Sequence, residues 1–444
     1  MVQTATNPIS HLYVHVPFCA QKCVYCAFFS EASSGELVNR YVDALIRELE
    51  MVAADLRPRT IFFGGGTPSL LNLRQWEQIL KTMERTNLLG AEEFTVECNP
   101  ATVSMDKAKL FRDFGINRIS MGVQSLDEDL LDRLGRIHSR TMVFKSFDIL
   151  RQAGFDNVNL DLMFAIPTQT MAIWQDTLNE AMAMQSEHLS SYEVIYEDDT
   201  PLYAQLKAGE FSVDENLACE MYEELISRSA AGGFHQYEIA NFARNVRPQP
   251  AAGELAALVS RQPALVSPSL SAIASATADT GGEGRGEGGR TSAPLAVEVA
   301  KPVFPNPAIP SLACKHNVNY WRGGSFYGLG PSATGYVRGV RSKNWSNTQL
   351  YCDQLEKGKR AIESSEELSP LRRAGETAAF GLRMNAGWPF EEFQQVTQFD
   401  LRREWASEMG QLEERGWAVR SEQYFQLTHQ GLRFADSAAE LFLR

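Results

Sequence analysis

The chain has 444 residues, of which 44% are hydrophobic and 22% are charged, and its formal net charge is −13. This length is sufficient for a barrel-sized domain with a smaller second domain, and the composition is that of a globular protein. A protein this acidic repels phosphate backbones, so nucleic acid is not expected as a partner.

Short apolar segments alternate with helical patterns through the first part of the chain. The segments with a strand-like pattern are 11–16, 60–63, 94–97, 118–121, 158–163 and 188–192. Between them, apolar residues at helical spacing predict helices over 38–53, 76–83, 104–114, 141–154 and 170–184. Strands that alternate with helices build parallel βαβ units. We therefore expect an α/β fold with a partial (β/α)6 barrel over residues 1–245.

The remainder of the chain divides into three parts by composition. Residues 246–312 are rich in Ala, Pro, Ser and Gly and nearly free of aromatic residues, which predicts a disordered insertion; a partner-binding loop is the alternative. Residues 313–360 resume an ordered pattern and are expected to complete the barrel. Residues 361–444 predict a small winged-helix-like α+β domain with a structural role. Its last expected elements are strands at 417–419 and 424–427 and a helix over 428–443.

The cysteines and the absence of targeting signals bear on the compartment. The chain has seven cysteines, an odd number spread over its length, which is not typical of a disulfide framework. No segment is apolar over the thickness of a bilayer, and residues 1–10 lack the basic and apolar regions of a secretion signal. We therefore expect a cytoplasmic protein.

Cys19, Cys23 and Cys26 follow the first expected strand with the spacing CxxxCxxC. Three thiolates can hold a four-iron, four-sulfur (4Fe–4S) cluster and leave one iron without a protein ligand. The amino and carboxylate groups of S-adenosylmethionine (SAM) can chelate that iron. A zinc site is the alternative, but zinc normally takes four protein ligands and no second cysteine pair lies nearby. His15 would then be a candidate fourth ligand, although its position before the loop favours a place in the barrel.

This motif directly after a first barrel strand resembles the signature of the radical SAM superfamily. Further matching segments are 13–19, 64–69, 97–100, 122–125, 135–138 and 161–163. They are similar to the family that contains the oxygen-independent coproporphyrinogen III dehydrogenases and the heme chaperones of the HemW type. The similarity extends over almost the whole chain apart from residues 247–312.

The resemblance and the chemistry of the side chains together predict a SAM site at the carboxyl ends of the strands. The residues expected to bind SAM are Tyr13, Tyr25, Gly65, Gly66, Thr67, Glu97, Gln124, Arg136 and Asp161. The Tyr25 ring can pack against adenine, and the glycines let the backbone approach a ligand closely. The Arg136 guanidinium matches the SAM carboxylate, and Asp161 can accept hydrogen bonds from the ribose or the amino group. In similar proteins, the residues that match Glu97 and Gln124 contact SAM. A structural ion pair between Glu97 and Arg136 is the alternative.

Two features distinguish between the branches of this family. Dehydrogenases usually carry a further cysteine two residues after the third cluster ligand, and here that position is Phe28. They also have a longer amino-terminal arm, which this chain lacks. Both departures favour the HemW type.

Residues 316–321 read HNVNYW and resemble the HNxxYW motif associated with heme binding in HemW-type proteins. A neutral imidazole is a good axial ligand for heme iron, so His316 is a candidate heme ligand. Tyr320 and Trp321 can pack on a porphyrin face. The alternative is a buried structural corner, and the motif alone does not decide between the two.

The resemblance implies two functions in porphyrin metabolism. The favoured one is a heme chaperone that holds a 4Fe–4S cluster, SAM and heme and passes heme to an apo-acceptor. A respiratory, membrane-bound acceptor and a homodimer whose formation depends on the cluster are both compatible with it. The second is a coproporphyrinogen III dehydrogenase, which removes propionate carboxyl groups by radical oxidative decarboxylation; we do not expect that activity here.

Overall fold

The structure is a computed structural model that describes residues 7–32, 34–247 and 309–443. Most of the expected insertion at 246–312 lies outside the described residues. No helix among the described residues is both long and apolar enough to cross a bilayer.

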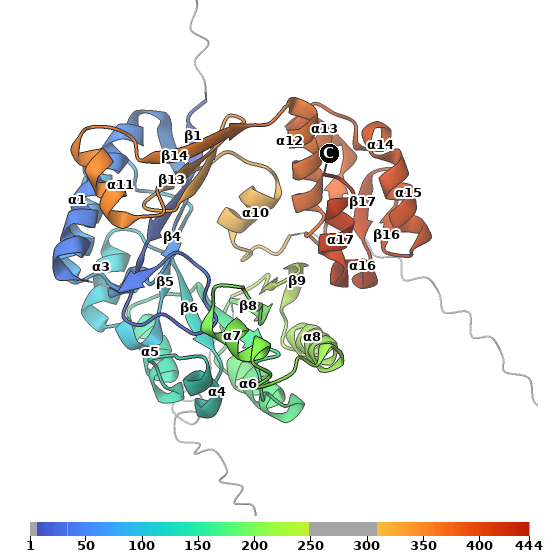
Figure 1. Cartoon of the computed structure of the whole chain (residues 1–444), viewed down its shortest axis with the longest axis horizontal. Coiled ribbons are helices and arrows are strands. Elements are labelled where there is room, and N and C mark those ends of the chain that lie inside the picture. The colour runs from blue at the N-terminus through green and yellow to red at the C-terminus, as the bar shows by residue number, and fades with distance from the viewer. Residues whose placement is uncertain (1–6, 33, 248–308, 444) are drawn as a thin grey trace, which may run out of the picture.

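One curved, nine-stranded sheet forms the larger part of the molecule (Figure 1). All six expected strands are present, and they run parallel to one another in chain order. They are β1 (Ile9–Val16), β4 (Leu56–Gly65), β5 (Glu93–Cys98), β6 (Arg118–Gln124), β7 (Val158–Phe164) and β8 (His188–Glu193). The α/β fold with a partial barrel is therefore confirmed.

Three strands that the sequence did not predict extend this sheet at its two edges. β11 (Tyr327–Leu329) pairs in parallel with β1, which brings a late segment of the chain beside the first strand. β10 (Asn241–Ala243) and β9 (His235–Glu238) continue the sheet antiparallel beyond β8. β11 and β9 are the edges of the sheet, so the barrel stays open.

Helices cover the outer face of the sheet, and each begins at a side chain that accepts a backbone N–H of the first turn. They are α1 (Gly35–Val52), α2 (Leu73–Arg85), α3 (Met105–Asp113), α5 (Arg140–Gln152), α6 (Met171–Ala183) and α8 (Glu215–Ala231). The caps are Ser34, Asn72, Ser104, Ser139, Thr170 and Asp214. Such caps satisfy amide donors that have no partner within the helix.

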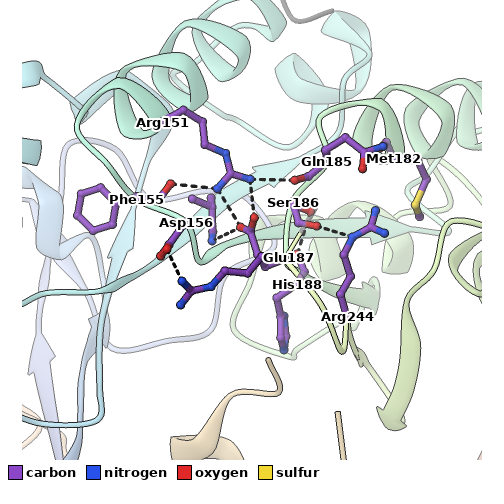
Figure 2. A network of polar contacts seen from close by, with 11 residues as sticks. Arg151, Phe155, Asp156, Met182, Gln185, Ser186, Glu187, His188 and Arg244 are labelled. Carbon is purple, nitrogen blue, oxygen red and sulfur yellow. Dashed lines mark hydrogen bonds and ion pairs between the residues drawn. The ribbon is translucent and has the colours of Figure 1, made fainter. Parts of the chain in front are cut away.

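A buried ion pair ties two turns together at the amino ends of β7 and β8 (Figure 2). Both terminal nitrogens of Arg151 donate to the Glu187 carboxylate, over 2.9 and 3.0 Å. Arg151 also donates to the carbonyl oxygens of Phe155 and Gln185, and the Val158 amide donates to Glu187. The pair therefore holds the turn before β7 against the turn before β8.

The chain after the barrel forms a second sheet and a second core. β12 (Thr334–Val337), β13 (Val340–Asn344) and β14 (Ile362–Glu367) form an antiparallel sheet, so this sheet crosses the expected domain boundary at 360–361. A separate apolar cluster forms within 370–443, around Trp388 and Trp405. Its elements are α12 (Pro370–Gly381), β15 (Trp388–Pro389), α13 (Phe390–Thr397), α14 (Leu401–Glu404), α15 (Ala406–Glu414), β16 (Ala418–Arg420) and β17 (Tyr424–Leu427).

The expectation of one continuous final helix over 428–443 is wrong. The segment contains α16 (His429–Arg433) and α17 (Ala435–Glu440), which are separated at Phe434. The Phe434 ring stacks on Trp417 with 4.6 Å between the ring centroids. A Cβ on Gly431 would lie 1.8 Å from the Trp417 carbonyl oxygen, so α16 packs directly on this chain segment. These contacts hold the chain where it turns, and Ala435 and Ala438 then face the core.

Candidate SAM and cluster site

A cavity of about 650 Å³ opens at the carboxyl ends of the parallel strands. Its lining comes from the loop that carries the three cysteines and from the ends of β4, β5, β6 and β7. Of the residues expected to bind the cluster or SAM, those that line it are Cys19, Cys23, Cys26, Tyr25, Gly65, Gly66, Thr67, Glu97, Gln124, Arg136 and Asp161. The structure thus gathers residues that are up to 142 positions apart, from Cys19 to Asp161, around one space.

The cysteine loop is closed by a short pair of strands. Cys19 ends β2 (Phe18–Cys19), which pairs with β3 (Glu31–Ala32) just after the loop. The three thiols are free and half-buried. No group of three His, Cys, Asp or Glu side chains in the described part of the chain converges on a point that would bind one metal ion. The fit to a metal centre therefore rests on this loop and on the cavity it faces, and not on a preformed coordination shell.

The glycines after β4 allow a close approach between strands as well as to a ligand. Gly65 has φ +110°, and a Cβ there would lie 2.6 Å from the His15 ring. A Cβ on Gly66 would lie 2.7 Å from the Phe18 carbonyl oxygen. A larger residue would push β4 away from the end of β1, so these positions require glycine even without a ligand.

Two carboxyl groups, Glu97 and Asp161, face the cavity, and neither forms an ion pair with another described side chain. Glu97 accepts from the Gly65 amide over 3.2 Å, and Asp161 accepts from Asn159 over 2.7 Å. Burial and, to a smaller extent, the neighbouring Asp161 charge raise the pKa of Glu97 to about 8. Burial likewise raises the pKa of Asp161 to about 6. Such a pair suits a ligand that carries positive charge, as SAM does at its sulfonium and amino groups.

Arg136 lies between the cysteine loop and β6. Its two terminal nitrogens donate to the Cys23 sulfur over 3.4 Å and to the Gly122 carbonyl oxygen over 2.7 Å. Its buried Nε has no hydrogen-bond partner among the described residues. A buried donor left without a partner is costly, and the carboxylate of SAM would satisfy it. Arg136 forms no ion pair with Glu97, so the structural alternative for that pair is absent here.

Gln124 owes its position to an irregular strand end. It ends β6 with φ +66°, which a residue with a Cβ seldom adopts. The pairing of β6 with β7 shifts register between Gly122 and Gln124. Bulges of this kind redirect side chains beside functional sites.

Tyr13 is not among the residues that line the cavity, and its role in SAM binding stays a prediction. β1 continues to Val16, so Tyr13 lies within the strand and not at its end. Its hydroxyl lies 3.0 Å from Nδ1 of His15, and Nε2 of His15 lies 2.8 Å from the Phe29 carbonyl oxygen. Tyr13 thus contacts His15, which in turn contacts the segment that follows the cysteines.

His316 also lies away from the cavity, in α10 (Lys315–Trp321). The Glu93 carboxylate caps this helix by accepting from the amides of Lys315 and His316. The His316 ring is 1% exposed, and its nitrogens lie 2.7 Å from Thr60 Oγ1 and 2.7 Å from the Tyr320 hydroxyl. Burial lowers the pKa of His316 to about 3, so the ring is neutral. To bind iron, it would have to release one of these hydrogen bonds.

The sequence reasoning missed the residues at the mouth of the cavity. Large apolar side chains line it there, although they are exposed: Phe28, Ile137, Tyr192 and Ile195. Phe28 was noticed only as the replacement of a cysteine. The others lie in loops or at a strand end, where a lone apolar residue carries no periodic signal.

Comparison with known families supports the architecture part by part. Residues 13–181 match the Radical SAM superfamily, and residues 368–434 match the HemN C-terminal domain. Among solved structures, the coproporphyrinogen III oxidase HemN from Escherichia coli, described as a radical SAM enzyme, has a TM-score of 0.73 and 18% identity. The structural match covers 98% of this chain and 90% of the HemN chain. At this sequence identity the likeness shows the fold alone.

Full-length relatives are more similar in sequence. The heme chaperone HemW of Bacillus subtilis (strain 168) is 30% identical over 437 residues, which cover 97% of this chain and 98% of the relative. The heme chaperone HemW of Escherichia coli (strain K12) is 28% identical, with 98% of each chain covered. A mitochondrial radical S-adenosyl methionine domain-containing protein 1 of Danio rerio is 28% identical, over 85% of this chain and 73% of the relative.

Proposed function

Because the chain belongs to the HemW family of the radical SAM superfamily, we propose that it is a heme chaperone that binds heme beside a SAM-ligated 4Fe–4S cluster. The observation that carries the proposal is the similarity to heme chaperones over nearly the full length, together with a cavity that joins the cysteine loop to the expected SAM residues. Heme is then delivered to an apo-acceptor in the cytoplasm or at a membrane, for example a respiratory enzyme.

The side chains have distinct tasks in this proposal. Cys19, Cys23 and Cys26 hold the cluster, which when bound supplies a redox-active iron with one open position for SAM. Arg136 orients the carboxylate of SAM through its free Nε. Glu97 and Asp161 face the positive charge of the ligand, and this charge would favour their ionised forms against the effect of burial.

The experiment is a pair of assays on the full-length protein, purified and reconstituted without oxygen. We expect iron and sulfide to be recovered with the protein, heme to bind in a Soret titration, and coproporphyrinogen III to remain unconverted in the presence of SAM. Zinc at the cysteines, or a protein that binds no heme, would contradict the proposal. The same sample in analytical ultracentrifugation, with and without the cluster, tests the proposed homodimer.

Coproporphyrinogen III dehydrogenase is the second candidate, favoured by the fold shared with HemN. Phe28 argues against it, because this side chain stands where those enzymes usually carry a further cysteine. Formation of protoporphyrinogen with consumption of SAM would make the enzyme the better description.

Ligation of heme iron by His316 stays a prediction. His316→Gln keeps a hydrogen-bonding side chain in the buried network and removes the imidazole. A loss of the Soret shift in this variant, at unchanged thermal stability, would support ligation; an unchanged spectrum would exclude it.

A further inference from the structure

The most exposed apolar side chains of the barrel gather at the mouth of one cavity. Phe28 is 72% exposed and Ile195 is 67% exposed. Among the described large apolar side chains only Val246 is more exposed, and Val246 adjoins the undescribed residues 248–308. Both Phe28 and Ile195 line the cavity that the cysteine loop faces.

Two more exposed apolar residues line the same mouth. Tyr192 is 44% exposed at the carboxyl end of β8, and Ile137 is 39% exposed directly after Arg136. The four side chains come from three separate parts of the chain: the cysteine loop, the segment between α4 (Glu128–Arg133) and α5, and the end of β8 with the loop after it. Single exposed apolar residues are ordinary, but a converging group at a cavity marks a binding surface.

The cavity has an inner zone and a rim, and their different side chains indicate which kind of ligand would bind at the rim. The inner zone holds the carboxylates and Arg136, which fit SAM, whereas the exposed apolar side chains lie at the rim. A rim of this kind fits a flat, rigid and largely apolar ligand that lies across the opening.

The charged residues at the rim add an orientation. Lys22 is exposed at the rim on the cysteine loop, Glu193 ends β8, and Glu197 lies in the loop after β8. An anionic edge of the ligand would be attracted to Lys22 and repelled by the two glutamates.

We propose that Phe28, Ile137, Tyr192 and Ile195 form the docking surface for one face of the heme macrocycle, with the heme propionates directed toward Lys22. This assignment rests on the proposed chaperone function and locates its cargo over the SAM cavity, away from His316. Phe28 lies two residues after Cys26, so the heme would sit directly beside the cluster. The replacement of a cysteine by Phe28 then has a positive role, because the aromatic ring supplies apolar area for the porphyrin face.

The test is a heme titration of the full-length, reconstituted protein. The double variant Phe28→Ser, Ile195→Ser should raise the heme Kd tenfold or more, because it removes the two most exposed apolar contacts. The matched control is Met142→Ser with Leu350→Ser, which are 43% and 40% exposed and do not line the cavity; its Kd should stay within twofold. Iron content and SAM binding of each variant report whether the site itself is intact.

A charge variant tests the orientation independently of folding. Lys22→Glu should weaken binding of heme and leave binding of heme dimethyl ester unchanged, since the ester has no free propionates. The double apolar variant should weaken binding of both ligands. If wild-type protein binds heme and neither variant changes the Kd, the docking surface is refuted and the chaperone function stands. If wild-type protein binds no heme, the proposed function itself fails.

Discussion

Because of its buried carboxyl groups, the free energy of unfolding of the protein should depend on pH, and substitution of single residues can test this. Glu97 titrates near pH 8 in the folded protein, against 4.5 for an ordinary glutamate, because it is buried and lies near Asp161. Between these pH values the folded protein holds a proton that the unfolded chain has lost. The contribution of Glu97 to the free energy of unfolding therefore falls as the pH rises through this window.

Glu97→Gln removes this penalty. In the absence of cofactors, we expect the variant to be more stable than the wild type at pH 8, by about 1 kcal/mol or more. The difference should vanish well below pH 4.5, where the wild-type carboxyl is protonated in both states. Urea unfolding at a series of pH values measures it. A constant difference across the series would show that burial does not govern the protonation of Glu97.

Arg136 is the residue whose geometry most directly demands a ligand. Its free Nε and its fork of donors match a carboxylate, and a lysine cannot reproduce this planar arrangement. We expect Arg136→Lys to weaken SAM binding tenfold or more while the cluster still assembles. Equilibrium dialysis with SAM, beside iron analysis of the same sample, separates the two effects. A variant with wild-type SAM affinity would show that Arg136 serves only the cysteine loop.

At the scale of the elements, the ion pair in Figure 2 joins the turns at the amino ends of β7 and β8. The Glu187 side chain is 2% exposed, and it accepts from Arg151 and from the Val158 amide. Removing one partner of a buried pair leaves the other charge uncompensated. We expect Glu187→Gln to lower the free energy of unfolding by about 3 kcal/mol.

A surface pair provides the control for this measurement. Glu77 and Lys81 form an ion pair on α2, with side chains 48% and 63% exposed. Glu77→Gln should change the free energy of unfolding by less than about 0.5 kcal/mol. Urea unfolding measures both variants. If both lost the same free energy of unfolding, burial would not explain the contribution of the Arg151–Glu187 pair.

At the scale of the whole molecule, α10 connects the barrel to the carboxyl-terminal core. Arg322, directly after α10, donates to the Gly387 carbonyl oxygen over 2.7 Å and lies 4.6 Å from the Trp388 ring centroid. It also lies 3.4 Å from a carboxylate oxygen of Glu392. One side chain thus makes three kinds of contact with the second core.

Arg322→Ala should loosen this connection. We expect a single unfolding transition in wild-type protein and an earlier, separate transition of the carboxyl-terminal part in the variant, because each part keeps its own apolar cluster. Differential scanning calorimetry checks this outcome. A single transition in both proteins would show that other contacts couple the two cores.

Local patterns in the sequence largely predicted the order of the strands and the residues that line the cavity. Apolar runs of four to six residues followed by helical spacing specify parallel βαβ units, and in such units the carboxyl ends of the strands share one edge. That rule alone predicts that the cysteine loop, Glu97 and Asp161 meet, and in the structure they line one cavity.

Tertiary structure decided what depends on contacts between distant segments. β11 pairs with β1 across more than three hundred residues, Tyr13 contacts His15, and His316 is enclosed by Thr60 and Tyr320. The sequence by itself determined the fold class and the cysteine motif, because these follow from periodicity and spacing along the chain, and its motif residues carried the family resemblance. Which side chains point into the cavity, and which apolar residues stay exposed at its mouth, depends on how the loops pack in space, and local spacing carries no record of that.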